Sequence, residues 1–194
     1  MTTARRYILV ACLGLGLALA APAAGQEACK TEILKNPALT LSEIYALAEA
    51  RAKAWKPDAI PARIGNSSLG PLKPDGSSEA WNLWFHSPAA NSSVTINTFR
   101  GSLTCYAQPG GAGRIPDLKP GFARDGAKLY ALAPQHGAAL IAKGYVVMLQ
   151  TAAAPSTRHA TWYLTFSGPD EKDGGLSVIV DANTGALEKV LSTR

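Results

Sequence analysis

The sequence predicts an α+β fold made of two tandem units of the α-β-β-β type, each a helix packed on an antiparallel sheet. Two observations carry this prediction. The apolar residues change from helical spacing to strand alternation once in each half of the chain, and short motifs recur in the same order about 84 positions apart. The connections between the expected strands are short, which favours antiparallel pairing with the helix on one face.

The first unit begins with a helical pattern. Apolar side chains recur every three or four residues from Leu41 to Trp55, Ser42 or Thr40 offers an N-cap, and the sequence 56–58 contains the proline that ends the pattern. Strands are expected at residues 60–64, 81–85, 93–98 and 103–106.

The second unit follows the same order. A helix is expected over residues 129–143 with Gly144 as its terminating glycine, although Pro134 and Gly137 interrupt the pattern and allow a start only at Pro134. A flexible connector is expected at 152–158. Strands are expected at residues 145–151, 162–166 and 176–181, with a short final strand.

Two motifs recur between the halves. Tyr-Ala-Leu-Ala at 45–48 returns 85 positions later at 130–133, and the Trp-x-Leu-x-Phe frame at 81–85 returns at 162–166. Residues 108–121, which carry four glycines and three prolines, separate the two units as a linker. The expected units are therefore residues 26–107 and 122–194.

The N-terminus predicts a cleaved signal peptide over residues 1–25. Two arginines precede an apolar run of about 14 residues, which is short of the ~20 that cross a bilayer, and small residues follow it. Cleavage is expected near Ala24 or Gln26, and the alternative is a retained anchor. Cys12 resembles a lipobox cysteine only by chance, because most of the apolar run follows it. We expect a periplasmic or secreted protein without stable membrane insertion.

Two cysteines remain after cleavage, Cys29 and Cys105. Two thiols in an oxidising compartment most often form one disulfide. A metal pair or a catalytic thiol is the weaker alternative, since there is no Cys-x-x-Cys and no histidine lies near either cysteine in the sequence.

Charge excludes one class of partner. Without Arg5 and Arg6 the chain has 17 basic and 14 acidic residues, a net charge of +3, and the basic residues are scattered singly. Nucleic-acid binding normally needs a concentrated basic patch. We expect no nucleic-acid partner.

No catalytic motif is present. The chain has no Gly-x-Ser-x-Gly, no His-Glu-x-x-His and no phosphate-binding loop, so we expect no enzyme, no cofactor and no metal. His86, His136 and His159 are expected to be surface residues. The Asp-x-Asn-x-Gly stretch at 181–185 predicts a hairpin turn with Asp181 bonding its amides, because the further acidic ligands of a calcium loop are missing.

The residues 178–185, Val-Ile-Val-Asp-Ala-Asn-Thr-Gly, together with the preceding strand at 162–166, resemble the closing hairpin of a PepSY domain. The resemblance covers residues 129–191 and is looser over 41–106, where Asn97 stands in place of the aspartate. It implies an exported protein that restrains or assists secreted peptidases. It implies no catalytic residues.

Trp84 and Tyr163 are the candidate binding residues. Strand alternation places them opposite the apolar faces of their strands, where exposed aromatic side chains can anchor a partner. We prefer the simpler interpretation that they are covered, either by packing of the two sheets or by the segment that Cys29 holds. The favoured function is a non-enzymatic binding module that regulates or inhibits an exported peptidase or binds another envelope protein.

The alternative function is a carrier of a small apolar ligand. Small helix residues (Ala46, Ala48 and Ala52) leave room for a cavity between helix and sheet.

Overall fold

A computed structural model describes residues 29–111, 113–153, 158–168 and 175–192. The predicted signal peptide, Cys12 and most of the connector at 152–158 lie outside these residues. Two helices are described, α2 (Leu41–Trp55) and α3 (Gly126–Ala142). In the part of the chain that the structure describes, neither is long and apolar enough to cross a bilayer.

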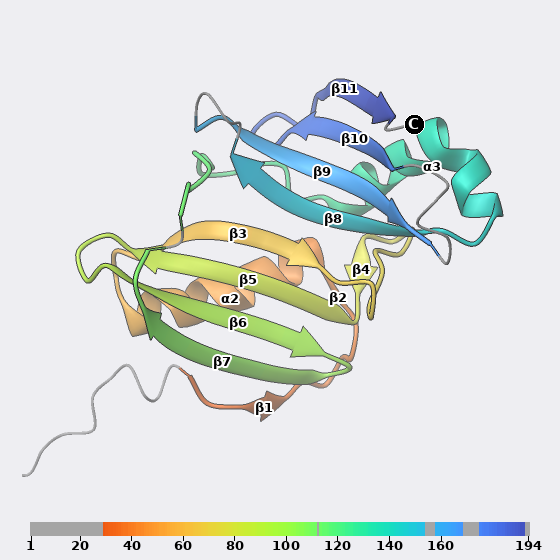
Figure 1. Ribbon diagram of the computed structural model, residues 1–194. Helices are drawn as coiled ribbons and strands as arrows, with labels where there is room; N and C mark the ends of the chain where they lie inside the picture. The colour runs from red at the N-terminus through yellow and green to blue at the C-terminus, as the bar shows by residue number, and fades with distance from the viewer. Residues whose placement is uncertain (1–28, 112, 154–157, 169–174, 193–194) are drawn as a thin grey trace, which may run out of the picture.

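The α+β class is confirmed: nine strands form one antiparallel sheet in the order β1-β7-β6-β5-β3-β8-β9-β10-β11 (Figure 1). Strands β2 and β4 form a separate pair. The strands are β1 (Glu32–Ile33), β2 (Leu39–Thr40), β3 (Ile60–Asn66), β4 (Ser77–Ser78), β5 (Ala80–Ser87), β6 (Ser92–Phe99), β7 (Ser102–Pro109), β8 (Val146–Ala153), β9 (Ala160–Ser167), β10 (Leu176–Asp181) and β11 (Leu187–Ser192).

Helix α2 forms where its periodicity predicts, and its N-cap is Thr40 rather than Ser42. The Thr40 hydroxyl accepts from the Glu43 amide at 3.3 Å, and the Glu43 carboxylate accepts from the Thr40 amide at 2.8 Å. This capping box satisfies two amides that the first turn leaves free. Ser42 instead donates its hydroxyl to the carbonyl of Arg124 at 2.8 Å.

Helix α3 begins three residues earlier than predicted, and the alternative start at Pro134 is wrong. Asp125 caps it by accepting from the Lys128 amide at 3.0 Å, so the helix has already formed when it reaches Pro134. The helix is distorted at Gly137, whose φ of −124° is not helical. Gly144, with a φ of +87°, follows the helix end as predicted.

Two tryptophans anchor the helices to the sheet. Trp81 and Trp162 are buried, as predicted, and each indole donates to a carbonyl just before a helix: Leu39 at 2.8 Å and Ala123 at 2.9 Å. A buried indole N–H needs such an acceptor. The start of each helix is thereby held to the first residues of a strand, β5 or β9.

One continuous sheet results because β3 pairs with β8. Gly65 lies opposite Gln150, the Thr151 hydroxyl accepts from the Ile64 amide at 2.8 Å, and the Asn66 side chain accepts from the Leu149 amide at 2.6 Å. The expectation that two sheets pack face to face over Trp84 is therefore wrong.

The same register places both helices on one face. Cross-strand partners point to the same side of a sheet, so Gly65, Gln150 and their partners lie opposite the buried Trp81 and Trp162 side chains. Figure 1 shows α2 crossing behind β5 and β6. We call the other side the helix-free face; it carries Arg63, Trp84, Thr95, Gln150 and Tyr163.

The predicted disulfide is confirmed. Cys29 is bonded to Cys105 across 76 positions of sequence, and β1 pairs with β7 at Glu32 opposite Leu103. The N-terminal segment thus lies along the edge of the sheet. Among the described residues this segment does not cover Trp84. The second explanation for a covered Trp84, the segment held by Cys29, is therefore wrong as well.

Candidate functional site

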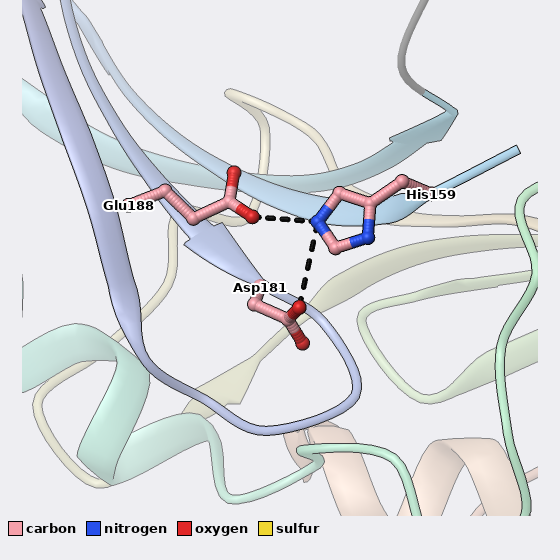
Figure 2. A group of neighbouring side chains, drawn as sticks. All are labelled: His159, Asp181 and Glu188. Carbon is pink, nitrogen blue, oxygen red and sulfur yellow. Dashed lines mark hydrogen bonds and ion pairs between the residues drawn. The ribbon is translucent and has the colours of Figure 1, made fainter. Parts of the chain in front are cut away.

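Three side chains of types that can bind metals or protons meet at one end of β9, β10 and β11 (Figure 2). His159 immediately precedes β9, Asp181 ends β10, and Glu188 is the second residue of β11. Their strands are consecutive neighbours in the sheet, which is why residues 22 and 29 positions after His159 reach it.

One ring nitrogen of the histidine faces both carboxylates. Nε2 of His159 lies 2.6 Å from Oε1 of Glu188 and 3.4 Å from Oδ2 of Asp181. The side chains are 39%, 31% and 19% exposed for His159, Glu188 and Asp181. The group is therefore accessible from solvent but partly shielded from it.

The hairpin turn after β10 holds Asp181 in place, as predicted. Its Oδ1 accepts from the amides of Asn183 at 2.8 Å and Thr184 at 2.7 Å, which leaves Oδ2 toward His159. Gly185 adopts a φ of +77°, a conformation that glycine enters without cost.

The linker at residues 108–121 forms hydrogen bonds with the same turn. The amide of Asp117 donates to the carbonyl of Arg158 at 2.7 Å, next to His159 in the chain. The Asn183 side chain accepts from the Lys119 amide at 2.8 Å and donates to the Asp117 carbonyl at 3.0 Å. The expected linker is tied to the second half of the chain at this point.

The surroundings favour the ionised states of His159 and Asp181. The hydrogen bond to Glu188 raises the pKa of His159, and the charges of Glu188 and Asp181 add to the effect. Burial raises the pKa of Asp181, but the hydrogen bonds from Thr184 and Asn183 and the charge of His159 outweigh it and leave that pKa lowered. An imidazole and two carboxylates at these distances can bind a cation and exchange protons.

His159 lies at the surface, as predicted, but it has two acidic partners that its neighbours in the sequence do not indicate. Spacing along the chain hides the group. Pairing β9 with β10 in the observed register, Thr161 opposite Asp181, would have revealed it, because His159 then lies on the same face as Asp181.

The other two histidines differ. His136 is exposed on α3, as predicted. His86 was expected in solvent but is buried, 8% exposed, with Nδ1 3.4 Å from the Ser93 hydroxyl. The chain leaving β7 covers it: Gly111 approaches the His86 ring, and the Ser93 hydroxyl donates to the Gly110 carbonyl.

Trp84 and Tyr163 both lie on the helix-free face, half-buried, and two polar side chains connect them. The Arg63 guanidinium lies 5.9 Å from the centre of the Trp84 ring, and it donates to the Gln150 side chain at 2.6 Å. Gln150 is the cross-strand partner of Tyr163. We call Trp84, Arg63, Gln150 and Tyr163 the cross-seam row, since it spans the junction of β3 and β8.

A hollow of about 270 Å³ adjoins this row, lined by Arg63, Trp84, Arg114, Gln150 and residues 151–153. The Trp84 indole N–H and the hydroxyl of its cross-strand partner Thr95 are buried without a hydrogen-bond partner among the described residues. Each unpaired buried polar group lowers the stability of the fold by about 1–3 kcal/mol. The packing on this part of the face is therefore not the most stable one for the chain alone.

Two larger hollows lie where the linker meets the helices. One of about 360 Å³ lies between α2, the start of β3 and the linker, and one of about 390 Å³ lies beside the start of α3. Charged side chains line both, among them Lys53, Arg124 and Lys128. Apolar side chains line both as well, Phe122 in each of them and Leu129 and Leu132 in the second. The carrier function stays a prediction.

Comparison with known proteins identifies no family: no protein-family model matches the chain, and no curated protein matches it. Among solved structures, the chain is similar to a putative lipoprotein from Clostridium difficile 630, with 12% sequence identity and a TM-score of 0.49. The similarity covers 76% of this chain and 91% of that one.

Proposed function

We propose that the chain is an exported, non-enzymatic binding module and that the cross-seam row is its contact with a protein partner. The observation that carries the proposal is the row itself: a tryptophan, an arginine and a tyrosine aligned across the face that no helix covers. These three residue types dominate the energetic centres of protein interfaces.

The chemistry of the row specifies a partner with an acidic loop. Two arginines, Arg63 and Arg114, line the hollow beside Trp84. A guanidinium binds a carboxylate through paired hydrogen bonds, and the chain carries a net positive charge that attracts an acidic surface.

Three observations support export and the assignment of the partner to a secreted or periplasmic peptidase. The first is the disulfide, which persists in oxidising compartments. The second is the signal-like sequence at residues 1–25. The third is the order of elements, a helix followed by four neighbouring antiparallel strands in each half, which is consistent with the proposed tandem PepSY-like units.

The experiment measures inhibition. Residues 26–194, purified with the disulfide formed, are titrated into a secreted metallopeptidase that cleaves a fluorogenic peptide. We expect slower cleavage, and we expect Trp84→Ala and Tyr163→Ala to weaken the effect about 30-fold, the equivalent of a 2 kcal/mol hot spot.

Leu69→Ala is the matched control, because Leu69 is 71% exposed in a loop away from the row. It should leave both inhibition and melting temperature unchanged. Unaltered cleavage with the wild-type chain would contradict the assignment to a peptidase. A large fall in melting temperature of Trp84→Ala with no separate loss of binding would show that the row serves packing alone.

A further inference from the structure

We propose that His159, Asp181 and Glu188 form a binding site for one divalent transition-metal ion, with Zn²⁺ as the favoured occupant. The site lies at the ends of β9, β10 and β11 and is separate from the cross-seam row. It requires no protein partner, so it stands independently of the function proposed above.

Convergence on a single nitrogen is the first argument. Nε2 of His159 faces an oxygen of Glu188 and an oxygen of Asp181 at once, as both dashed lines in Figure 2 show. A ring N–H points in one direction and satisfies one acceptor well, here Glu188 at 2.6 Å, while Asp181 remains at 3.4 Å. A cation placed among the three atoms would use the lone pairs of all of them.

The distances are close to those of a metal site. Ligand atoms about 2.0–2.1 Å from a tetrahedral ion are about 3.3 Å from one another. The separation of Nε2 and Oδ2 is 3.4 Å, and all three donor atoms lie within 4.8 Å of one another. Nε2 of His159 and Oε1 of Glu188 would have to separate by about 0.7 Å on this geometry, and Glu188 has a flexible side chain on the edge strand β11.

The donor set selects the class of ion. One imidazole nitrogen and two carboxylate oxygens suit Zn²⁺ and neighbouring divalent transition ions better than Ca²⁺, which takes six to eight oxygens. Three protein ligands leave a coordination position for water, as in open zinc sites.

Hydrogen bonds already hold the Asp181 carboxylate in place. The other oxygen of Asp181 accepts two amide hydrogens from the turn, and hydrogen bonds from the linker hold that turn in position. Outer hydrogen bonds of this kind fix the orientation of ligating carboxylates. Binding displaces the proton that Nε2 shares with Glu188, and that proton passes to the solvent.

Isothermal titration with Zn²⁺ tests the site, with residues 26–194 stripped of metal by a chelator. We expect one ion per chain, with release of a proton seen as a dependence of the measured heat on the ionisation enthalpy of the buffer. His159→Ala and Glu188→Gln should each weaken binding at least tenfold. His136→Ala, which removes an exposed histidine elsewhere, should bind like the wild type.

Circular dichroism establishes that each variant is folded, and the imidazole NMR signals of His159 give a second readout. Zinc should shift the His159 signals and leave those of His136 unchanged. The absence of saturable one-to-one binding, or equal binding by His159→Ala, would overturn the proposal and identify the three residues as an ion-paired cluster only. Loss of peptidase inhibition without loss of zinc binding would bear on the proposed function alone.

Discussion

Helix α3 packs closely on its sheet at Gly137. A Cβ built there would lie 2.3 Å from the Phe166 ring, deep under the helix. Gly137→Ala should destabilise the fold by about 1–3 kcal/mol through overpacking, despite the gain of up to about 1 kcal/mol in helix propensity. Urea unfolding measures the difference. Gly111→Ala, where a Cβ meets only ordinary contacts, should be close to neutral.

Asp58 links the end of α2 to the turn after β5 through its carboxylate. It accepts from the Ala89 amide at 2.9 Å and from the Ser87 hydroxyl at 2.8 Å. These two hydrogen bonds lower the pKa of Asp58 below its ordinary value of 3.8, and the bond from the Ala89 amide has the larger effect. A lowered pKa means that the native state binds the proton less tightly than the unfolded chain. The stabilisation is therefore present above the unfolded pKa and is lost as the pH falls through the folded one.

The variant Asp58→Asn isolates this contribution. Its stability should be below that of the wild type near neutral pH, and the gap should narrow as the pH falls below 3.8. Chemical unfolding of both proteins over that range measures the gap. A difference that is independent of pH would assign the role to the shape of the side chain and not to its charge.

At the level of elements, strand alternation and capping signals predict most of what forms. Helix α2 and the core strands β5 and β9 follow directly from periodicity, because each has one apolar face. The short strands β1, β2 and β4 were not predicted, since two residues carry no alternation. The start of α3 was missed because its first turn, which Asp125 caps, lacks the apolar spacing by which the rest was recognised.

The disulfide is the element-scale feature with the largest expected effect. It ties the N-terminal segment to β7 and closes a loop with a sequence separation of 76. Replacing both cysteines by alanine should cost up to about 4–5 kcal/mol on the chain-entropy model, and β1 should lose its protection from hydrogen exchange. Thiol labelling of the folded, unreduced chain 26–194 should find no free cysteine; a reactive Cys29 or Cys105 would contradict the compartment assigned to the protein.

At the scale of the whole molecule, the sequence predicts single residues of the candidate sites but not which residues come together. Alternation along β5 and β9 places Trp84 and Tyr163 on the helix-free face, but the row between them depends on Arg63 and Gln150, which are 87 positions apart. Their contact requires the pairing of β3 with β8, for which no local pattern exists. The group at His159 was missed for the same reason, because sheet register and not sequence spacing brings its carboxylates together.

The pairing of β3 with β8 also affects whether the molecule unfolds in one cooperative step. The α2 half, residues 39–109, and the α3 half, residues 122–192, share a sheet and a core. Tyr45 of α2 packs edge-on against Phe122 with ring centres 4.9 Å apart, and Phe122 lies 6.2 Å from the ring of Trp162. Such contiguous packing predicts a single cooperative transition for the wild type.

Gly65 is the position at which this coupling can be broken. A Cβ there would lie 2.9 Å from the backbone oxygen of Leu149 in the neighbouring strand β8, so the Gly65→Val side chain must push β3 and β8 apart. We expect the variant to lose stability and its two halves to open separately, because the hydrogen bonds across the junction weaken while each remaining strand ladder stays intact. Hydrogen exchange read by mass spectrometry follows both halves at once: core strands β5 and β9 should exchange with one common free energy in the wild type and in Gly111→Ala, and with two different ones in Gly65→Val. Equal exchange of β5 and β9 in a destabilised Gly65→Val would mean that the shared core around Phe122, and not the strand junction, couples the two halves.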